Sequence, residues 1–422
     1  MTEKKFIQIH TLTSYAAALL NRDDAGFAKR IPFGGKTRTR VSSQCLKYHW
    51  RHHNGLHSLY GGELPQSQRS RVTFGRLVVE PLVKEGHPEP LALAIVHGLK
   101  ELVISEKKVK KGAIKSVLNP KDDEDPRDAV LTNQVTVLGA PEIRYLKQLA
   151  GEVIAEAKAA IPDGWDKEHG AYGDDEVGAV LDALSNVATK DLKKNLRGMK
   201  LASGLDAALF GRMTTSDILA RGDAALHVAH AFTTHAQASE SDYFSAVDEL
   251  AAAEGKLGGG HINSTELTSG LFYGYVVIDV PLLISNIEGC ARDEWRDADR
   301  GLAADVIERF IHMVATVSPG AKLGSTAPYA HAEAVLVEAG ADQPRTLANA
   351  FRKAVLEEPD VLENSYQALG RYVRELDHMY QTSTERRLAA RGPVEGLVDS
   401  VSAPANTPLP EIATWTANVV RG

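Results

Sequence analysis

A dense cluster of positive charge near the start of the chain could bind phosphate groups. Between Asn21 and Arg51 the only acids are Asp23 and Asp24, against eight Lys/Arg residues: Arg22, Lys29, Arg30, Lys36, Arg38, Arg40, Lys47 and Arg51. This basic window carries about +6 in a chain whose formal net charge is −7. Its charges are nearly unmixed, whereas solvated faces usually alternate in sign. The hydroxyl, amide and backbone N–H groups between the cations suit phosphates and sugars. The residues alone therefore favour polyanion binding over a solvated charged surface.

Two other patterns in the basic window could do chemistry, and each has a plainer interpretation. Gly34–Thr37 reads GGKT, the end of a phosphate-binding loop, but Arg30 occupies the position of the first glycine. We therefore expect no nucleotide hydrolysis. Asp23 and Asp24 could bind a divalent metal through carboxylate oxygens. Pairing with neighbouring arginines and lysines is the simpler interpretation, and a metal-dependent endoribonuclease using Asp23 or Asp24 stays the alternative.

The rest of the sequence offers few groups arranged for catalysis. Neither HExxH nor Gly-x-Ser-x-Gly occurs, and two cysteines, Cys45 and Cys290, cannot form a disulfide framework. His227 and His230 are expected to be strand residues. We therefore expect no catalytic residue, no metal and no cofactor.

Tyr243 and Phe244 stand in an otherwise polar, glycine-rich segment. Aromatic side chains in such a place could form a wedge or stacking surface for bases. From these residues alone, packing against their own strand or helix is the favoured interpretation. The segment is expected to project between two strands.

A strand before the basic window and a helix after it must position its charges. Phe6–Ser14 alternates apolar and polar residues, the period of a half-buried strand. The window itself is predicted as a loop interrupted by Pro32, Gly34 and Gly35. A helix is expected to begin with Ser42 or Ser43 as its N-cap, with its positive dipole end facing the window. Lys47 and Arg51 lie four residues apart and would share a face of that helix.

The remaining elements indicate an α+β chain with one β core built from both ends of the sequence. Residues 88–200 look helical, with a charge-dense linker at 107–126. Strand signals return at 204–213, 226–232 and 270–280, and helices are expected at 299–319, 346–356, 365–380 and 411–420. The composition, 43% hydrophobic and 24% charged, is ordinary for a soluble protein. No stretch is long and apolar enough for a membrane span, and we expect a cytoplasmic protein.

Several of these segments together resemble a known family. IHTLTSYAAALLNRDDAGFAKRIPFGGKTRTRVSSQCLK, ALFGRMTTSDILARGDAALHVAHAFTTHAQASESDYFSAVDEL, ELTSGLFYGYVVIDV and HMVATVSPGAK occur in the order found in the CasC family. This family, in the Cas-seven superfamily, is the backbone subunit of Cascade, the type I-E CRISPR surveillance complex. The resemblance covers most of residues 5–55 and 203–325, and elsewhere only a helical character fits.

The resemblance implies an architecture and a role. Residues 1–59 and 201–422 would form a modified RNA-recognition-motif (ferredoxin-like) palm, with a β-hairpin thumb at about Gln237–Thr268. Residues 60–200 would form a helical fingers domain. Copies would polymerise head to tail along crRNA, the guide, and present its bases to target DNA in antiviral defence. The other partners would be the large subunit, the small subunit and the Cas-five and Cas-six type subunits. No membrane and no catalysis are implied for this subunit.

The resemblance also assigns residues to the ribonucleoprotein interface. The guide-RNA contacts would be Arg22, Lys29, Ser42, Gln44, Lys47, Arg51 and Met213. The thumb tip at the displaced nucleotide would be Tyr243, Phe244, Ser245 and Ile262. Tyr48 departs from the family, where a basic residue follows Lys47, and the glycines of GKLGGG leave the register around Ile262 open.

Overall fold

The chain consists of two compact units. The computed structural model describes residues 3–59, 64–162, 164–165, 171–187, 189–197, 199–212, 222–247, 259–382 and 384–422. The first unit contains residues 1–61, 226–280 and 300–422, and the second contains 62–225 and 281–299. Residues 201–225 and 281–299, which the sequence grouped with the palm, are therefore part of the second unit. Hydrogen bonds explain this grouping, since Ser67 donates to Asp206 at 2.6 Å and the Leu201 N–H donates to the Ile287 carbonyl at 2.9 Å.

An antiparallel sheet forms the centre of the first unit. In the described residues its strand order is β11-β10-β1-β9-β7-β3-β2, and β6 and β8 also pair with β9. β1 lies between β9 and β10, with Phe6 opposite both Asp279 and Gly340. The expected β core built from both ends of the sequence is thus confirmed. The strands are β1 (Phe6–Ala18), β2 (Arg30–Phe33), β3 (Lys36–Val41), β6 (Leu226–Val228), β7 (Ala231–Thr233), β8 (Ala238–Val247), β9 (Gly259–Asp279), β10 (Ala332–Gly340) and β11 (Glu385–Ala390).

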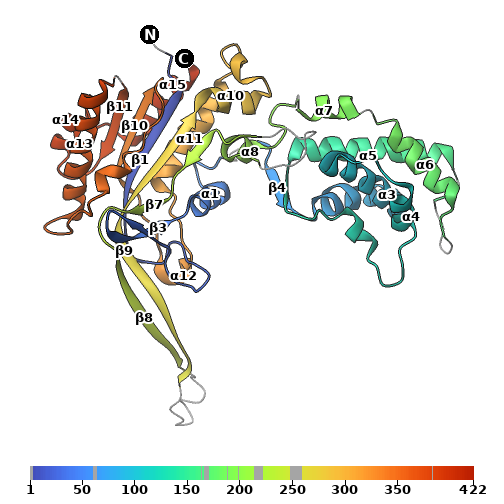
Figure 1. Cartoon of the computed structure of the whole chain (residues 1–422), viewed down its shortest axis with the longest axis horizontal. Helices are drawn as coiled ribbons and strands as arrows, with labels where there is room; N and C mark the ends of the chain where they lie inside the picture. The colour runs from blue at the N-terminus through green and yellow to red at the C-terminus, as the bar shows by residue number, and fades with distance from the viewer. Residues whose placement is uncertain are drawn as a thin grey trace. The chain divides into compact units, whose positions relative to one another are not determined.

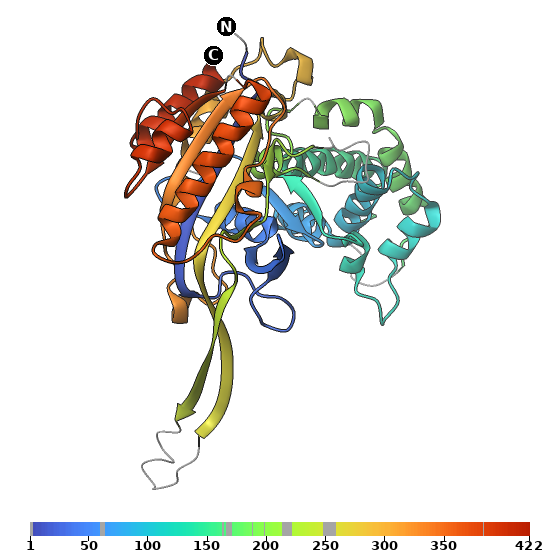
Figure 2. The same cartoon turned by 60° about the vertical axis from the view of Figure 1, so that its left-hand side comes forward.

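Helices cover both faces of this sheet. α13 (Val361–Tyr380) lies across one face with α14 (Glu395–Ser400), and Figure 2 shows α13 in front of the strands. α11 (Gly301–Thr316) and α15 (Leu409–Arg421) pack together and against β10. The helix expected at 346–356 is reduced to the 3₁₀ turn η5 (Ala348–Phe351), whose Phe351 is buried under the α13 face. α1 (Ser43–His52) and α12 (Leu323–Thr326) complete the unit.

The sheet face under α13 contains a buried ionic network. Glu338 of β10 is fully buried and accepts hydrogen bonds from Arg345 at 2.8 Å, from Arg386 at 2.6 Å and from His10 at 3.1 Å. Arg386 also binds the carboxylate of Asp377. Burial alone would raise the pKa of Glu338, but the hydrogen bonds and charges of His10 and Arg345 hold it well below its usual value. Burial lowers the pKa of His10. The strands are therefore joined here by charge as well as by apolar packing.

The second unit is mainly helical and has its own apolar core, which includes α3, α5 and α6. Residues 204–213, predicted as a strand, contain instead α8 between two glycines with positive φ, Gly204 and Gly211. Among the described helices of the chain, none is long and apolar enough to cross a membrane. The elements of this unit are β4 (Ser67–Ser70), η1 (Gly75–Val79), α2 (Glu80–Lys84), α3 (Glu89–Lys100), η2 (Glu101–Ser105), α4 (Lys111–Leu118), η3 (Pro126–Val130), β5 (Thr136–Gly139), α5 (Ala140–Ala160), α6 (Asp174–Ser185), α7 (Thr189–Arg197), α8 (Leu205–Phe210), α10 (Val280–Glu288) and η4 (Arg292–Glu294).

A two-stranded ribbon extends from the sheet of the first unit. β8 pairs with the first half of β9, from Ala238 opposite Ser269 to Val247 opposite Gly259. The second half of β9 pairs with β1 inside the sheet. Figure 1 shows the ribbon leaving the end of the sheet opposite the N-terminus. This ribbon occupies the residues at which the sequence predicted a thumb, and we call it the thumb below.

Candidate nucleic-acid interface

The basic window folds as a β-hairpin and not as the predicted loop. β2 and β3 pair from Arg30 opposite Thr39 to Phe33 opposite Lys36, which leaves Gly34 and Gly35 as a two-residue turn. Both glycines have positive φ (59° and 78°), as a tight hairpin turn of this twist requires. A side chain at Gly34 would also collide with the carbonyl of Arg352, because its Cβ would lie 1.5 Å from that oxygen. The glycines that seemed to interrupt a loop therefore close a hairpin.

Arg38 of β3 does not face solvent. Its side chain is fully buried, and Nη1 donates to the carbonyl oxygens of residues 233–235 at 2.7 to 3.3 Å. Nη2 donates to the carbonyls of Phe351 and Arg352 at 2.9 and 3.4 Å. This guanidinium joins β3 to the turn after β7 and to η5. One of the eight cations of the basic window is therefore structural.

Arg30 and Arg40 lie on neighbouring strands of the hairpin with different partners. Arg30 pairs with the carboxylate of Glu266 on β9. Arg40 contacts the ring of His230 at 3.1 Å and donates from Nε to the Arg30 carbonyl at 3.2 Å. Burial, and then the charges of Arg40 and Lys29, lower the pKa of His230. Lys29 and Arg40 thus form a positively charged neighbourhood around His230.

Lys29 belongs to a loop that backbone hydrogen bonds order. Its N–H donates to the Asn21 carbonyl at 2.9 Å, and its own carbonyl accepts from Arg40 at 2.8 Å. Asp23 Oδ1 accepts from the backbone N–H groups of Ala25 and Phe27, both at 3.0 Å. The carboxylate of Asp23 is thus used to form a turn. Asp24 is exposed, and the described residues contain no group of three or more His, Cys, Asp or Glu side chains that could hold a metal.

The helix α1 begins where its sequence predicted. The Ser42 hydroxyl accepts from the Cys45 N–H at 3.3 Å, so Ser42 is the N-cap, and it is buried. The Ser42 N–H donates to Asn21 Oδ1 at 2.9 Å, which attaches the helix to the loop carrying Lys29. Burial raises the pKa of the Cys45 thiol to about 11 and the charge of Lys29 opposes this rise, so Lys29 lies near the first turn of α1.

The predicted RNA contacts of α1 differ in exposure. Gln44 is exposed, and Lys47 and Arg51 are half-buried. Tyr48, which stands where the family has a basic residue, is exposed and stacks on His52 with ring centres 4.1 Å apart. The structure thus gathers Arg22, Lys29, Gln44, Lys47 and Arg51 on a loop and a helix that are hydrogen-bonded to each other. Ser42 contributes through the helix cap.

The thumb residues have a defined register. Ser245 lies opposite Ile262, Phe244 opposite Asn263 and Tyr243 opposite Ser264. Tyr243 is 66% exposed, so most of its side chain is accessible on the ribbon. The side chains of Phe244, Ser245 and Ile262 lie outside the described residues, as does the whole of Met213.

Two residues near this surface were missed by the sequence analysis. Lys322 donates to the hydroxyl of Thr265 at 2.5 Å, and Glu266 binds the loop and the hairpin. Lys322 ends the motif HMVATVSPGAK, which carried part of the family resemblance, and that was its only signal in the sequence. Glu266 begins the motif ELTSGLFYGYVVIDV, which also carried part of the resemblance, but nothing in the sequence indicated its partners Ala28 and Arg30, which lie more than 200 residues away.

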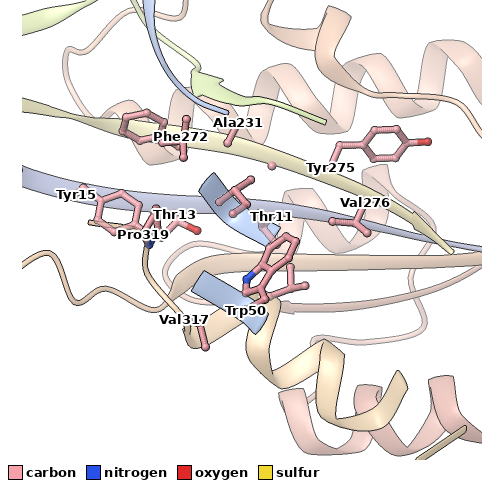
Figure 3. Close-up of a pocket in the computed structure, with 14 residues that line it drawn as sticks. Thr11, Thr13, Tyr15, Trp50, Ala231, Phe272, Tyr275, Val276, Val317 and Pro319 are labelled. Carbon is pink, nitrogen blue, oxygen red and sulfur yellow. The ribbon is translucent and has the colours of Figure 1, made fainter. Parts of the chain in front are cut away.

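A small cavity lies between the sheet and α1. Figure 3 shows Trp50 beside Thr11 and Val317, with Tyr15 and Phe272 also on the lining. Its volume of about 50 Å³ is large enough for only a few water molecules. The fourteen lining residues include no carboxylate, imidazole, thiol or amine. The cavity is therefore a packing gap under α1, and the candidate site is the charged surface outside it.

Comparison with known proteins identifies the family. The family model described as CT1975-like protein matches residues 7–415. The fold matches a chain of a CRISPR RNA-guided surveillance complex, pre-nicking, over 98% of this chain and 100% of that one, with TM-score 0.72 and 25% identity. A chain of another CRISPR RNA-guided surveillance complex, 18% identical with TM-score 0.54, covers 98% of both chains and shows likeness of fold alone. No curated protein is a significant match. Because the family match spans nearly the whole length, this chain belongs to the CT1975-like protein family.

Proposed function

We propose that this chain is the crRNA-binding backbone subunit of a type I-E CRISPR surveillance complex, Cascade. Copies polymerise head to tail along the guide RNA and present its bases for pairing with target DNA. The chain itself is not an enzyme, and target cleavage belongs to another protein. The observation that carries the proposal is the surface built from the loop at 21–29 and α1, which has the residues expected of a guide-binding groove. The likeness to a surveillance-complex chain over 98% of the sequence supports it.

The chemistry of this surface suits a guide of any sequence. Guide spacers differ in sequence, so the subunit must bind phosphates and sugars and leave the base edges free. Arg22, Lys29 and Lys47 offer cations, and Gln44 offers an amide that can bind a ribose or phosphate oxygen. None of these groups needs a particular base.

The thumb supplies the second part of the proposed mechanism. Tyr243 and Phe244, with Ile262 across the ribbon, would lie against the nucleotide displaced from the guide–target duplex. Separating stacked bases costs a few kcal/mol per step, which an apolar or aromatic wedge offsets. Repetition of this insertion in each copy would divide the duplex into regular segments. The palm is an RNA-recognition-motif sheet in this proposal, and the helical unit serves as the fingers.

The proposed assembly has defined partners. Head-to-tail contact between copies is heterologous and does not close into a ring, so it produces an open filament. The filament would contact the large and small subunits and be bounded by the Cas-five and Cas-six type subunits. The assembly would act in the cytoplasm.

The assembly is tested by binding the purified chain to RNAs of increasing length and weighing the products by native mass spectrometry. A backbone subunit adds copies in steps as the RNA lengthens. A discrete monomer or dimer at every length would indicate a stand-alone RNA-binding protein and would refute the proposal.

The binding surface is tested by Lys29→Ala and Lys47→Ala. Each should weaken binding about equally for all guide sequences and lower the slope of log affinity against log salt by about 0.7. Lys5→Ala is the matched control, because Lys5 is exposed beside the start of β1, about 40 Å from its other end at 3.3 Å per residue. Strongly sequence-dependent effects would argue against backbone binding.

A further inference from the structure

The root of the thumb is joined to the end of β1. The Ala17 N–H donates to the hydroxyl of Ser269 at 2.9 Å, and the Thr268 hydroxyl donates to the Ala18 carbonyl at 3.0 Å. The register of β1 against β9 shifts between Tyr15 and Ala18, and Ala17 has a positive φ of 47°. β1 is therefore irregular at the point where β9 enters the thumb, pairs with it once more at Ala18 opposite Thr268, and then continues into the loop at 21–29, which we call the basic loop.

Glu266 lies on β9 two residues before Thr268, toward the tip of the thumb, and it binds that basic loop directly. Its side chain is buried, and Oε2 accepts from the Ala28 N–H at 2.8 Å. Its other oxygen, Oε1, pairs with the guanidinium of Arg30. Gln237, at the base of β8, reaches the same oxygen at 3.5 Å. The carboxylate of Glu266 thus connects both strands at the thumb root to residues 28–30, the segment that contains Lys29.

Thr265, the adjacent residue, connects the thumb to a second loop. Its hydroxyl accepts from Lys322 at 2.5 Å. That loop is joined to Leu19, the residue after β1, by the hydrogen bond from the Ala321 N–H to the Leu19 carbonyl at 2.9 Å, and to α1 by the bond from the Gly320 N–H to His49 at 3.3 Å. The thumb root therefore lies at the junction of the two loops and the helix that form the candidate interface.

We propose that Glu266 is a positioning residue that holds the basic loop at a fixed place relative to the thumb. This inference rests on the proposed function. By binding Ala28 and Arg30, Glu266 sets the distance between the cations that hold the guide backbone and the thumb that displaces a nucleotide. The negative charge of a carboxylate inside a phosphate-binding surface repels RNA phosphates. We therefore expect Glu266 to favour RNA binding in another way that offsets this repulsion. Ordering the loop before RNA arrives is that role, since preorganisation reduces the entropy lost on binding.

Simple electrostatics and a positioning role predict opposite changes in RNA affinity when the Glu266 carboxylate is removed. Removal of a negative charge near phosphates should tighten RNA binding, whereas loss of a positioning group should weaken it. We expect Glu266→Ala to weaken guide binding about tenfold at 0.1 M salt with a salt slope no lower than that of the parent, because the phosphate contacts still form in the complex and Arg30 loses its carboxylate partner. Glu266→Gln should stay within about threefold of the parent, since its amide oxygen still accepts from Ala28. Glu240→Ala is the matched control, an exposed acid on β8 of the same thumb, and should bind as tightly as the parent or tighter.

A second readout separates positioning from general destabilisation. In the assembled complex, 2-aminopurine placed at the displaced nucleotide of the target reports its unstacking. Glu266→Ala should reduce this signal and spread it over neighbouring positions, and Glu266→Gln should restore it, with the circular dichroism spectrum unchanged in both. Parent-like guide affinity and 2-aminopurine signal in Glu266→Ala would overturn the inference and leave the proposed function intact. Failure of the unmodified chain to bind guide RNA would instead overturn the proposed function.

Discussion

Arg38 and Arg40 lie two residues apart on β3, but the same substitution should affect protein stability at Arg38 and RNA binding at Arg40. Arg38 is fully buried against carbonyl oxygens, whereas Arg40 is half-buried in the positively charged neighbourhood around His230. Methionine keeps much of the arginine stem and removes the guanidinium. We expect Arg38→Met to destabilise the first unit without altering RNA contacts, and Arg40→Met to weaken RNA binding without altering stability.

The size of the Arg38 effect follows from its hydrogen bonds. Three carbonyl oxygens, those of Thr233, Thr234 and Phe351, lie within 2.9 Å of the guanidinium. A hydrogen bond to a charged group contributes about 1.5–3 kcal/mol, and a buried carbonyl left without a donor costs about 1–3 kcal/mol. We therefore expect Arg38→Met to lower the free energy of unfolding by about 4 kcal/mol, a large part of the 5–15 kcal/mol of an ordinary domain. Arg40→Met should change it by less than about 1 kcal/mol.

Two measurements test this contrast. Urea unfolding followed by circular dichroism gives the stability of each variant, and RNA binding at several salt concentrations gives the slope. Arg40→Met should lower the slope by about 0.7 at unchanged stability. Arg38→Met should lower stability and, in urea-free buffer where it is still folded, retain the parent slope. A parent-like stability for Arg38→Met would refute the structural role of this cation, and a reduced slope would mean that it contacts RNA.

Three further predictions concern the thumb, the ionic network and the aspartates. Phe244→Ala and Ile262→Ala should slow target-strand pairing more than they weaken guide retention, measured in the same complex; equal losses would mean that the thumb assignment is wrong. Glu338 and His10 both have a lower pKa in the folded state, so the unfolded chain binds more protons below their ordinary values of 4.5 and 6.5. Urea unfolding should therefore show stability falling as pH drops through 6.5 and then 4.5, and a maximum below pH 5 would contradict this. Asp24→Ala should leave complementary RNA uncut by the assembled complex with Mg²⁺, like the parent; periodic cuts by the parent that this variant lacks would establish the endoribonuclease alternative.

The periodicity of the sequence predicted those elements that bury one face. α1, α11, α13 and α15 all show an apolar period, and the N-cap at Ser42 was readable from its residue type. β1 was expected as a half-buried strand, but residues 7–12 are all buried because helices cover both faces of the sheet. Elements buried on all sides gave no such period. α8, whose six residues are all buried, was therefore taken for a strand. β10 went unrecognised because its acids, one of them the buried Glu338, made an interior strand look polar.

The candidate site was predictable as a region but not residue by residue. Local sequence cannot distinguish Arg38, a cation surrounded by carbonyls, from Arg40, because both alternate with threonine in the same strand. The difference arises from residues 233–235 and 351–352, which the fold brings to β3 from distant parts of the chain. Glu266 and Lys322 were missed for the same reason, since each acquires its role from a partner that only the tertiary structure supplies.

These partners change the charge that the basic window can offer to RNA. Of its eight cations, Arg38 is used by carbonyl groups inside the first unit and Arg30 is paired with Glu266. The window can then supply no more than six phosphate contacts. At about 0.7 per contact, the salt slope of guide binding contributed by this window should not exceed about 4 per copy. A steeper slope would require cations from elsewhere in the chain, and Lys322, which donates to Thr265 beside the thumb root, is a candidate.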